Sequence, residues 1–260
     1  MRIAGLQMQA VVGDIDANLV KIETAAGQAA AAGARLLIAP ELALTGYGAA
    51  ERFLDLAAHA DGNLPERLAA IARRHGLAIV AGFAERDGDD VYNSALLIDS
   101  EGRQTVYRKS HLYGPYEKRW FRPDDPRTVL VTVDGVRLGM LICYDVEFPE
   151  NVRRLAQAGA DLVVVPTALP TGWSGRFIAE HMIRVRAFEN QVFVAYINHC
   201  GSDPHFAYAG LSRIAAPDGS LLAEAAAEGE ALLMTDIDPS AYAASRSENT
   251  YLADLGEKSR

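Results

Sequence analysis

The sequence predicts an α/β protein, in which strands and helices alternate along one chain. Short runs of β-branched and aliphatic residues recur, such as LLIAP at Leu36–Pro40, and alanine-rich stretches of helical period separate them. The chain has 260 residues, 50% of them hydrophobic, which is enough to bury one large core. Because α/β domains of this size often remain undivided, we expect a single domain over residues 1–260.

The first half of the chain predicts five strands and two helices. Ile3–Met8 is expected to form the first strand, and GDIDAN after it a turn and helix cap. A helix over Asn18–Ala32 ends at Gly33, and the next strand, Leu36–Pro40, ends immediately before Glu41. The remaining elements are a helix at Pro65–His75, strands at Leu77–Glu85 and Val91–Asp99, and a strand at Gln104–Arg108 that leads into Lys109.

The second half begins with a segment of no clear period. Ser110–Arg127 is expected to form a long ordered loop, and such loops in compact domains are usually functional. The alternation then resumes, so that Cys143 is expected at a junction between a strand and a helix. The predicted elements are the strand Val136–Ile142, the helix Phe148–Ala158, the strand Asp161–Pro166, the helix Gly175–Asn190, the strand Val192–Asn198 and a hairpin at Pro217–Ser220.

Charge and cysteine content exclude several classes of protein. Lys and Arg number 25 against 34 Asp and Glu, a formal net charge of -9, which argues against nucleic acid as a main partner. No apolar run reaches transmembrane length and the N-terminus does not resemble a signal peptide, so we expect no membrane attachment and a cytoplasmic location. Cys143 and Cys200 are too few for a disulfide framework.

Three residues of reactive type follow predicted strands. Glu41 and Lys109 each come directly after a strand, where burying a charge is costly unless the charge is paired or functional. Cys143 precedes a predicted helix whose N-terminus would help its thiol lose a proton. Taken singly, each residue also fits an ordinary role, two surface charges and a buried structural cysteine, which is the role we assign to Cys200.

Three segments together resemble the nitrilase superfamily of carbon-nitrogen hydrolases. They are APELALTGY at Ala39–Tyr47, YRKSHL at Tyr107–Leu112 and LICYDVEFPE at Leu141–Glu150, and the similarity extends over nearly the whole chain. The resemblance implies a four-layer α-β-β-α sandwich and a catalytic triad of Glu41 as base, Lys109 as electrostatic partner and Cys143 as nucleophile. It also implies a homodimer or higher homo-oligomer, for which the tail 240–260 is a candidate interface. Because the histidines lack metal-ligand spacing, we expect no metal, and we expect no cofactor.

The family also uses a second glutamate in the loop after the lysine. In YEKRWFRPDD this residue corresponds to Glu117, although Asp124 stands where the family usually has glycine. The resemblance implies that Glu117 orients Lys109 and that the backbone N–H of Tyr144 helps to stabilise the oxyanion. A solvated loop acid is the alternative for Glu117.

The expected reaction is hydrolysis of a small aliphatic amide through a thioester on Cys143. Glu147, four residues after Cys143, stands where relatives that act on N-carbamoyl amino acids place arginine, so it favours an amino-bearing substrate; it could equally complement the helix N-terminus. The resemblance is greatest to 5-aminopentanamidase-like amidases. The alternative is an N-carbamoyl amine amidohydrolase, and a nitrilase or a catalytically silent scaffold is less favoured than either. Further candidate substrate-binding residues are Tyr116, Thr167, Ala168 and Trp173.

Overall fold

Two six-stranded sheets form the centre of the molecule in the computed structural model, which describes residues 1–258. The first sheet has the strand order β12-β1-β2-β3-β4-β5, with β1, β2 and β3 parallel and the other pairs antiparallel. Its strands are β1 (Arg2–Gln7), β2 (Leu36–Ile38), β3 (Ala78–Asp87), β4 (Asp90–Ile98), β5 (Gln104–Arg108) and β12 (Ala231–Asp236).

The second sheet repeats this plan in the order β11-β10-β9-β8-β7-β6, with β7, β8 and β9 parallel. The predicted PDGS hairpin joins β10 to β11 at one edge. The strands are β6 (Leu130–Val133), β7 (Val136–Met140), β8 (Leu162–Thr167), β9 (Phe193–Asn198), β10 (Arg213–Ala215) and β11 (Leu221–Glu224). In each sheet the parallel strands end at one edge, where connecting segments can converge.

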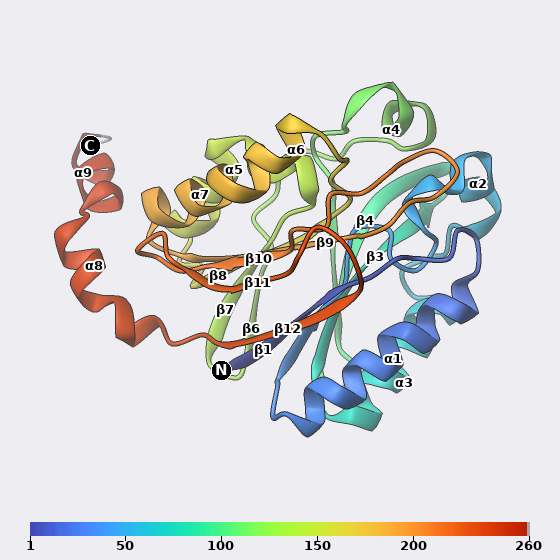
Figure 1. The fold of residues 1–260 in the computed structure, drawn as a ribbon, viewed down its shortest axis with the longest axis horizontal. Coiled ribbons are helices and arrows are strands. Elements are labelled where there is room, and N and C mark those ends of the chain that lie inside the picture. The colour runs from blue at the N-terminus through green and yellow to red at the C-terminus, as the bar shows by residue number, and fades with distance from the viewer. Residues whose placement is uncertain (259–260) are drawn as a thin grey trace.

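Helices cover the outer faces of both sheets, which confirms the predicted four-layer α-β-β-α sandwich. Figure 1 shows α1 (Ile15–Ala31) and α3 (Asn63–His75) on one side, and α5 (Pro149–Gln157) and α7 (Ile183–Asn190) on the other. The strand period of two divides the core: Leu37 packs with α1 and α3, whereas Leu36 and Ile38 pack between the sheets. A side chain at Gly5 of β1 would overlap Ile197 of β9, so the two sheets approach closely there.

Some boundaries differ from the prediction. Asp14, not a later residue, caps α1 by accepting a hydrogen bond from Ala17 N at 2.9 Å, so the helix begins three residues before Asn18. Asn18 is buried because its side chain binds the backbone of Val11 and Leu44. The predicted helix 175–190 begins two residues earlier, with α6 (Trp173–Phe177), and contains a π-helical segment (Ile178–Met182) before α7.

The expected loop at Ser110–Arg127 contains a helix, α4 (Gly114–Trp120), and strand β6 lies shortly after it. A seven-residue helix beginning Gly-Pro is too short to show a helical period, which is why the pattern missed it. Other connections contain short helical segments: the 3₁₀ segments Tyr47–Arg52 and Cys143–Glu147 follow β2 and β7, and the short helix α2 (Phe53–Leu56) follows the first of them.

The C-terminal tail leaves β12 in the first sheet and crosses to the helices over the second (Figure 1). It contains a 3₁₀ turn (Pro239–Tyr242), α8 (Ala243–Glu248) and α9 (Tyr251–Lys258). Tyr242 packs edge-on against Phe193 at 5.2 Å and Tyr251 against Phe188 at 5.9 Å, both between ring centroids. The tail therefore packs on its own chain, and the last two residues of the predicted interface segment lie outside the described residues.

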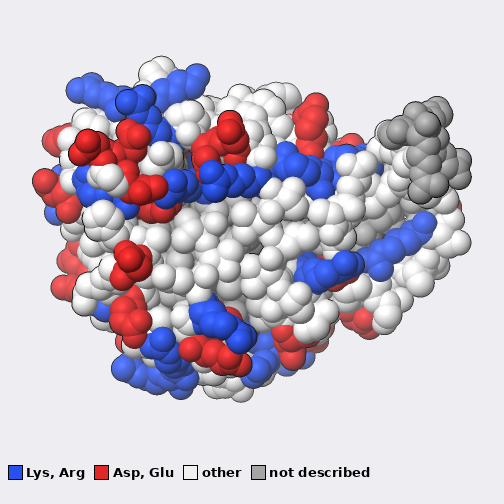
Figure 2. Space-filling view, turned by 180° about the vertical axis from the view of Figure 1, so that it is seen from behind, with Lys and Arg blue, Asp and Glu red and all other residues white. Residues whose placement is uncertain are grey.

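The surface in Figure 2 carries acidic and basic side chains along the margins of a broad uncharged region. Because the two signs lie close together in several places, their fields partly cancel beyond about one Debye length. Among residues 1–258, no helix is long and apolar enough to cross a bilayer.

Candidate active site

Glu41 lies at the end of β2, in a turn that depends on a close backbone approach. Leu42 has a positive φ of 49°, and Gly82 N of the neighbouring β3 donates to Pro40 O at 3.0 Å. A Cβ at Gly82 would overlap the backbone of Glu41 and Leu42. Only glycine therefore allows β3 to lie against this turn and hold the Glu41 side chain in the interior.

Lys109 lies at the end of β5, with no exposed surface. Its backbone N donates to Asn93 O at 2.8 Å, which continues the pairing with β4 by one residue. Its ammonium donates to Glu41 Oε1 at 2.6 Å and to Glu117 Oε1 at 2.7 Å, and all three side chains are fully buried. Burial alone lowers the pKa of Lys109, but the charges of Glu117 and Glu41 outweigh it and raise this pKa well above its usual value. Lys109 is therefore a fixed cation.

Glu117 reaches this cluster from α4. Besides Lys109, its carboxylate accepts hydrogen bonds from Tyr113 N and from Tyr47 OH, both at 2.8 Å. Burial first, and then the charge of Glu117, raises the pKa of Tyr47 well above its usual value, so its hydroxyl stays protonated and donates. Glu117 is thus a buried, fully bonded acid and not the solvated loop acid that was the alternative.

The two oxygens of Glu41 differ in their contacts. Oε1 accepts from Lys109 and from Asn93 Nδ2 at 2.7 Å, whereas Oε2 is buried and has no hydrogen-bond partner among the described residues. Burial raises the pKa of Glu41 to about 7, with the Lys109 charge opposing this shift and the Glu117 charge adding to it. Near neutral pH both the ionised and the protonated form are therefore accessible, and one oxygen is free to bind a proton.

Cys143 comes from the other sheet, three residues after the end of β7. It begins the 3₁₀ segment with a positive φ of 44°, a conformation that is unusual for any residue except glycine. Burial, followed by the negative charge of Glu41, raises the pKa of its thiol well above the usual value; Lys109 and a hydrogen bond from the backbone N–H of Ala168 oppose this shift. The expectation that a helix N-terminus lowers this pKa is therefore wrong.

A cavity of about 480 Å³ opens onto Cys143. Four of the predicted substrate-binding residues line it: Tyr144, Glu147, Ala168 and Trp173, together with Tyr113 and the apolar Leu169 and Ile178. Glu147 is half-buried, and burial raises its pKa to about 7. Trp173, 77% exposed, stacks on Phe177 with ring centroids 5.2 Å apart, at the outer rim.

Two predicted substrate-binding residues lie outside the lining of this cavity. Thr167 is buried and its hydroxyl donates to Val165 O at 2.9 Å within its own strand. Tyr116 lies on α4, where its hydroxyl donates to Tyr47 O and accepts from Ala50 N, both at 2.9 Å. Its ring lies 5.6 Å from that of Tyr47. Tyr116 therefore holds Tyr47, which in turn binds Glu117.

The family model for carbon-nitrogen hydrolases matches residues 2–247. The chain belongs to the carbon-nitrogen hydrolase family. A hydrolase in the pqqF 5' region of Pseudomonas protegens is 44% identical over 257 residues, which cover 98% of this chain and 88% of the relative. An (R)-stereoselective amidase of a Pseudomonas species is 35% identical over 259 residues, covering 98% of this chain and 91% of the relative.

The solved structures that resemble the chain include an amidase of the nitrilase superfamily from Nesterenkonia sp. AN1. A cysteine-to-alanine variant of that amidase in complex with butyramide superimposes with a TM-score of 0.87 and 36% identity, over 98% of this chain and 93% of that one. Another structure of it carries the acetamide moiety of fluoroacetamide covalently on its active-site cysteine. This chain is thus a hydrolase of carbon-nitrogen bonds other than peptide bonds, within the amidase branch of the superfamily.

Two residues that hold the hydrolase site together, Asn93 and Tyr47, had no role assigned from the sequence, and they bind the two glutamates. His199 bridges the sheets, with Nε2 2.7 Å from Glu41 O and Nδ1 3.2 Å from Met8 O. A polar Asn-Ser pair inside the apolar run of β4 was the one available sign of Asn93. No group of three His, Cys, Asp or Glu in the described part of the chain could hold a metal ion.

Arg186 of α7 donates to Val146 O at 2.9 Å and to Glu147 O at 2.7 Å, so it holds the end of the 3₁₀ segment that begins at Cys143. Cys200 is buried, and burial raises the pKa of its thiol to about 11.

Proposed function

We propose that this amidase of the nitrilase superfamily hydrolyses a small aliphatic, amino-bearing amide to the carboxylic acid and ammonia, through a thioester on Cys143. The observation that carries the proposal is the Glu41 carboxylate. It is buried beside a fixed cation, its pKa is about 7, and one of its oxygens has no partner among the described residues.

The first step requires a base, because the Cys143 thiol holds its proton at neutral pH. Glu41 Oε2 accepts that proton as the sulfur attacks the amide carbon, and the products of this step are a carbon–sulfur bond and a tetrahedral oxyanion. Transfer of the proton into the cluster becomes favourable as negative charge moves from the sulfur to the oxyanion.

The oxyanion is stabilised by donors that are already in place. Lys109 has three N–H groups and donates two of them to Glu41 and Glu117, which leaves the third for the substrate. We assign the second donor to the backbone N–H of Tyr144, which lines the cavity directly after Cys143. Removing one such donor commonly lowers kcat about 10²- to 10³-fold.

Glu41 then returns its proton to the leaving nitrogen, and ammonia departs as the carbon–nitrogen bond breaks. Water enters, gives a proton to Glu41 and attacks the thioester, and the carboxylic acid leaves as the thiol is restored. Glu117 keeps the Lys109 ammonium oriented through both halves of the reaction, since Tyr47 and Tyr113 hold its carboxylate in turn.

The amino-bearing substrate is inferred from the cavity. Glu147 is an acid in the cavity that contains Cys143, and Tyr113, Tyr144 and Trp173 present aromatic surface to the same space. A carboxylate favours an ammonium group and disfavours a carboxylate on the substrate, and aromatic faces attract cations. An N-carbamoyl amine differs only at its reacting end, so the same features make it the alternative substrate.

The experiment is an ammonia-release assay on a panel of amides: 5-aminopentanamide, N-carbamoylputrescine, butyramide and succinamate. We expect kcat/KM to be highest for one of the two amino-bearing compounds, and an acyl adduct on Cys143 in mass spectra of the stalled enzyme. Preference for succinamate would refute the amino-bearing substrate. Turnover retained in Cys143→Ala would refute the thioester mechanism, and thiol cycling without ammonia would indicate a redox protein.

We further propose that the protein forms a homodimer or a higher homo-oligomer. Trp173 and Phe177 are 77% and 41% exposed, lie four residues apart on α6, and stack with ring centroids 5.2 Å apart, so they share one face. Apolar side chains exposed together on one face often mark an interface between proteins. Light scattering of Phe177→Glu should then show a smaller particle than the wild type; an unchanged mass would exclude this face.

A further inference from the structure

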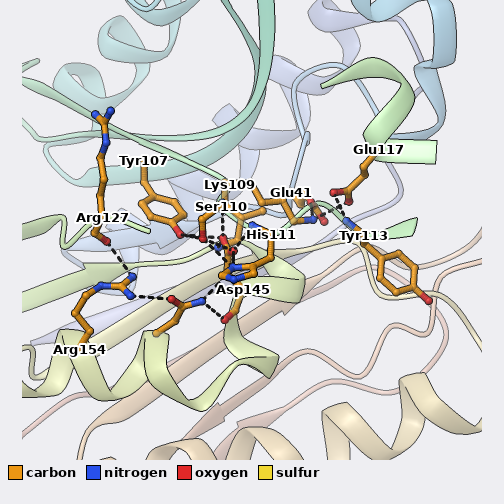
Figure 3. A network of polar contacts seen from close by, with 12 residues as sticks. Glu41, Tyr107, Lys109, Ser110, His111, Tyr113, Glu117, Arg127, Asp145 and Arg154 are labelled. Carbon is orange, nitrogen blue, oxygen red and sulfur yellow. Dashed lines mark hydrogen bonds and ion pairs between the residues drawn. The ribbon is translucent and has the colours of Figure 1, made fainter. Parts of the chain in front are cut away.

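A buried carboxylate two residues after Cys143 takes no part in the proposed chemistry. Asp145 has no exposed surface, and its two oxygens accept hydrogen bonds from the segment at the end of β5 (Figure 3). Oδ1 accepts from Ser110 Oγ and His111 N, both at 2.8 Å, and lies 2.9 Å from His111 Nδ1; Oδ2 accepts from Tyr107 OH at 2.9 Å. This one side chain therefore binds polar groups of three residues in a segment that lies 34 to 38 residues earlier in the sequence.

These contacts join the two sheets where the active-site residues leave them. Tyr107, Ser110 and His111 flank Lys109 on the first sheet, and Asp145 follows Cys143 on the second. The carboxylate thus fastens the backbone on both sides of Lys109 to the turn that carries the sulfur.

A second set of contacts holds the same turn from α5. Asn151 Nδ2 donates to Asp145 O at 2.9 Å and lies 3.3 Å from His111 Nδ1, while Arg154 Nη1 donates to Asn151 Oδ1 at 2.8 Å (Figure 3). Asp145 is therefore held through both its side chain and its backbone.

The need for such a link follows from how the charged cluster is divided. Glu41, Lys109 and Glu117 all come from the first sheet and its connections, and short hydrogen bonds fix them to one another. Cys143 alone comes from the second sheet. Apolar packing between sheets has no preferred direction, whereas hydrogen bonds to a buried carboxylate are directional and strong.

We propose that Asp145 is a positioning residue that fixes the Cys143 sulfur relative to the Lys109 ammonium. This inference rests on the proposed function, in which the sulfur attacks a carbon whose oxygen is bound by that ammonium. Asp145 lies outside the cavity lining and acts only through the two segments that it joins.

Asp145→Asn tests the proposal. The asparagine side chain has the same shape as the carboxylate, but an NH₂ group replaces one of the two accepting oxygens and points at hydrogen-bond donors. The link between the sheets is therefore weakened. We expect kcat for butyramide to fall about 10- to 100-fold, the range seen when a supporting hydrogen-bond partner is removed, with KM changed less than threefold.

The decisive measurement is the ratio of amide turnover to p-nitrophenyl acetate turnover. An activated ester needs less stabilisation from the oxyanion donors than an amide does. Misplacement of Cys143 relative to Lys109 therefore lowers amide turnover more than ester turnover, whereas loss of folded enzyme lowers both rates equally. A fall of about tenfold in this ratio supports positioning. An unchanged ratio overturns it, whatever happens to the melting temperature.

Asp161→Asn is the matched control. Asp161 accepts from Arg137 N at 3.0 Å at the opposite end of the second sheet, so its amide variant should leave the ratio unchanged.

If Asp145→Asn does not fold, Tyr107→Phe removes a single donor: a smaller fall in the ratio supports the proposal and an unchanged ratio overturns it. If Cys143→Ala retains amide turnover, the proposed function itself fails; if that variant is inactive and the ratio is unmoved, only this inference fails.

Discussion

Replacing Glu147 by glutamine tests the charge that selects the substrate. Glu147 lines the cavity, and burial raises its pKa to about 7. A hydrogen bond between charged groups contributes about 1.5–3 kcal/mol net, which corresponds to about 10- to 150-fold in binding. At about pH 8.5, where Glu147 is ionised, we expect KM for 5-aminopentanamide to rise by this factor in Glu147→Gln, and KM for butyramide to change less than about threefold.

The same carboxylate predicts a pH dependence of KM in the wild type. Ionised Glu147 binds the ammonium group, and the ionised fraction rises from about one tenth at pH 6 to about nine tenths at pH 8 for a group with pKa near 7. KM for 5-aminopentanamide should therefore fall about tenfold over this interval, since the substrate amine stays protonated throughout. KM for butyramide should stay nearly constant.

Steady-state ammonia release at several pH values measures both effects. Glu150→Gln, which removes an exposed acid three residues further along, is the matched control and should leave KM of both amides unchanged. Equal KM for the amino amide in wild type and Glu147→Gln at the higher pH would refute the reasoning, because it would mean that the substrate ammonium does not meet this carboxylate.

Three further outcomes follow from the charged cluster. Gly82→Ala should lower the melting temperature and kcat together, because its methyl group overlaps the backbone of Glu41 and Leu42; overpacking of this kind costs about 1–3 kcal/mol, readable by thermal unfolding. Lys109→Met should lower kcat, measured by ammonia release, at least about 10²-fold, because the oxyanion loses a donor. The same change should destabilise the fold, because Glu117 and Glu41 would face one another without a cation. In the wild type, kcat/KM for butyramide should fall as pH decreases through about 7, since protonated Glu41 cannot accept the thiol proton; a flat profile between pH 5 and 8 would contradict this role.

The sequence was most informative about where the strands end. Glu41 and Cys143 each follow an apolar run, and Lys109 directly follows the predicted strand Gln104–Arg108, so all three stand where a predicted strand ends. Their convergence follows from topology, because β2 and β5 point the same way in the first sheet, and a parallel bridge between Met8 and His199 gives β7 of the second sheet that direction too. Local pattern therefore placed these three residues at strand ends, and the resemblance to the nitrilase superfamily was needed to assign them to one triad.

The contacts that set the chemistry of the cluster are not local. Asn93 binds Glu41 across 52 residues, and Tyr47 binds Glu117 across 70, so no window of sequence contains both partners. The short helix that carries Glu117 is held by its bonds to Lys109 and Tyr47 more than by its own helical propensity. The thiol prediction was wrong for a similar reason: adjacency to a helix was visible in the sequence, but the burial that raises the pKa of Cys143 was not.

Glu117 has an electrostatic effect on Glu41 as well as a geometric one on Lys109. Two carboxylates share one ammonium in a space without solvent, and the negative charge of Glu117 helps to raise the pKa of Glu41 to about 7. Glu117→Gln should therefore move the acidic limb of kcat/KM to lower pH, because Glu41 ionises more easily once that charge is gone. The same change makes Glu41 a weaker base, so the pH-independent rate should fall as the limb moves. A pH profile of butyramide hydrolysis decides the matter: a limb that stays at its wild-type position would show that Glu117 only holds the lysine in place.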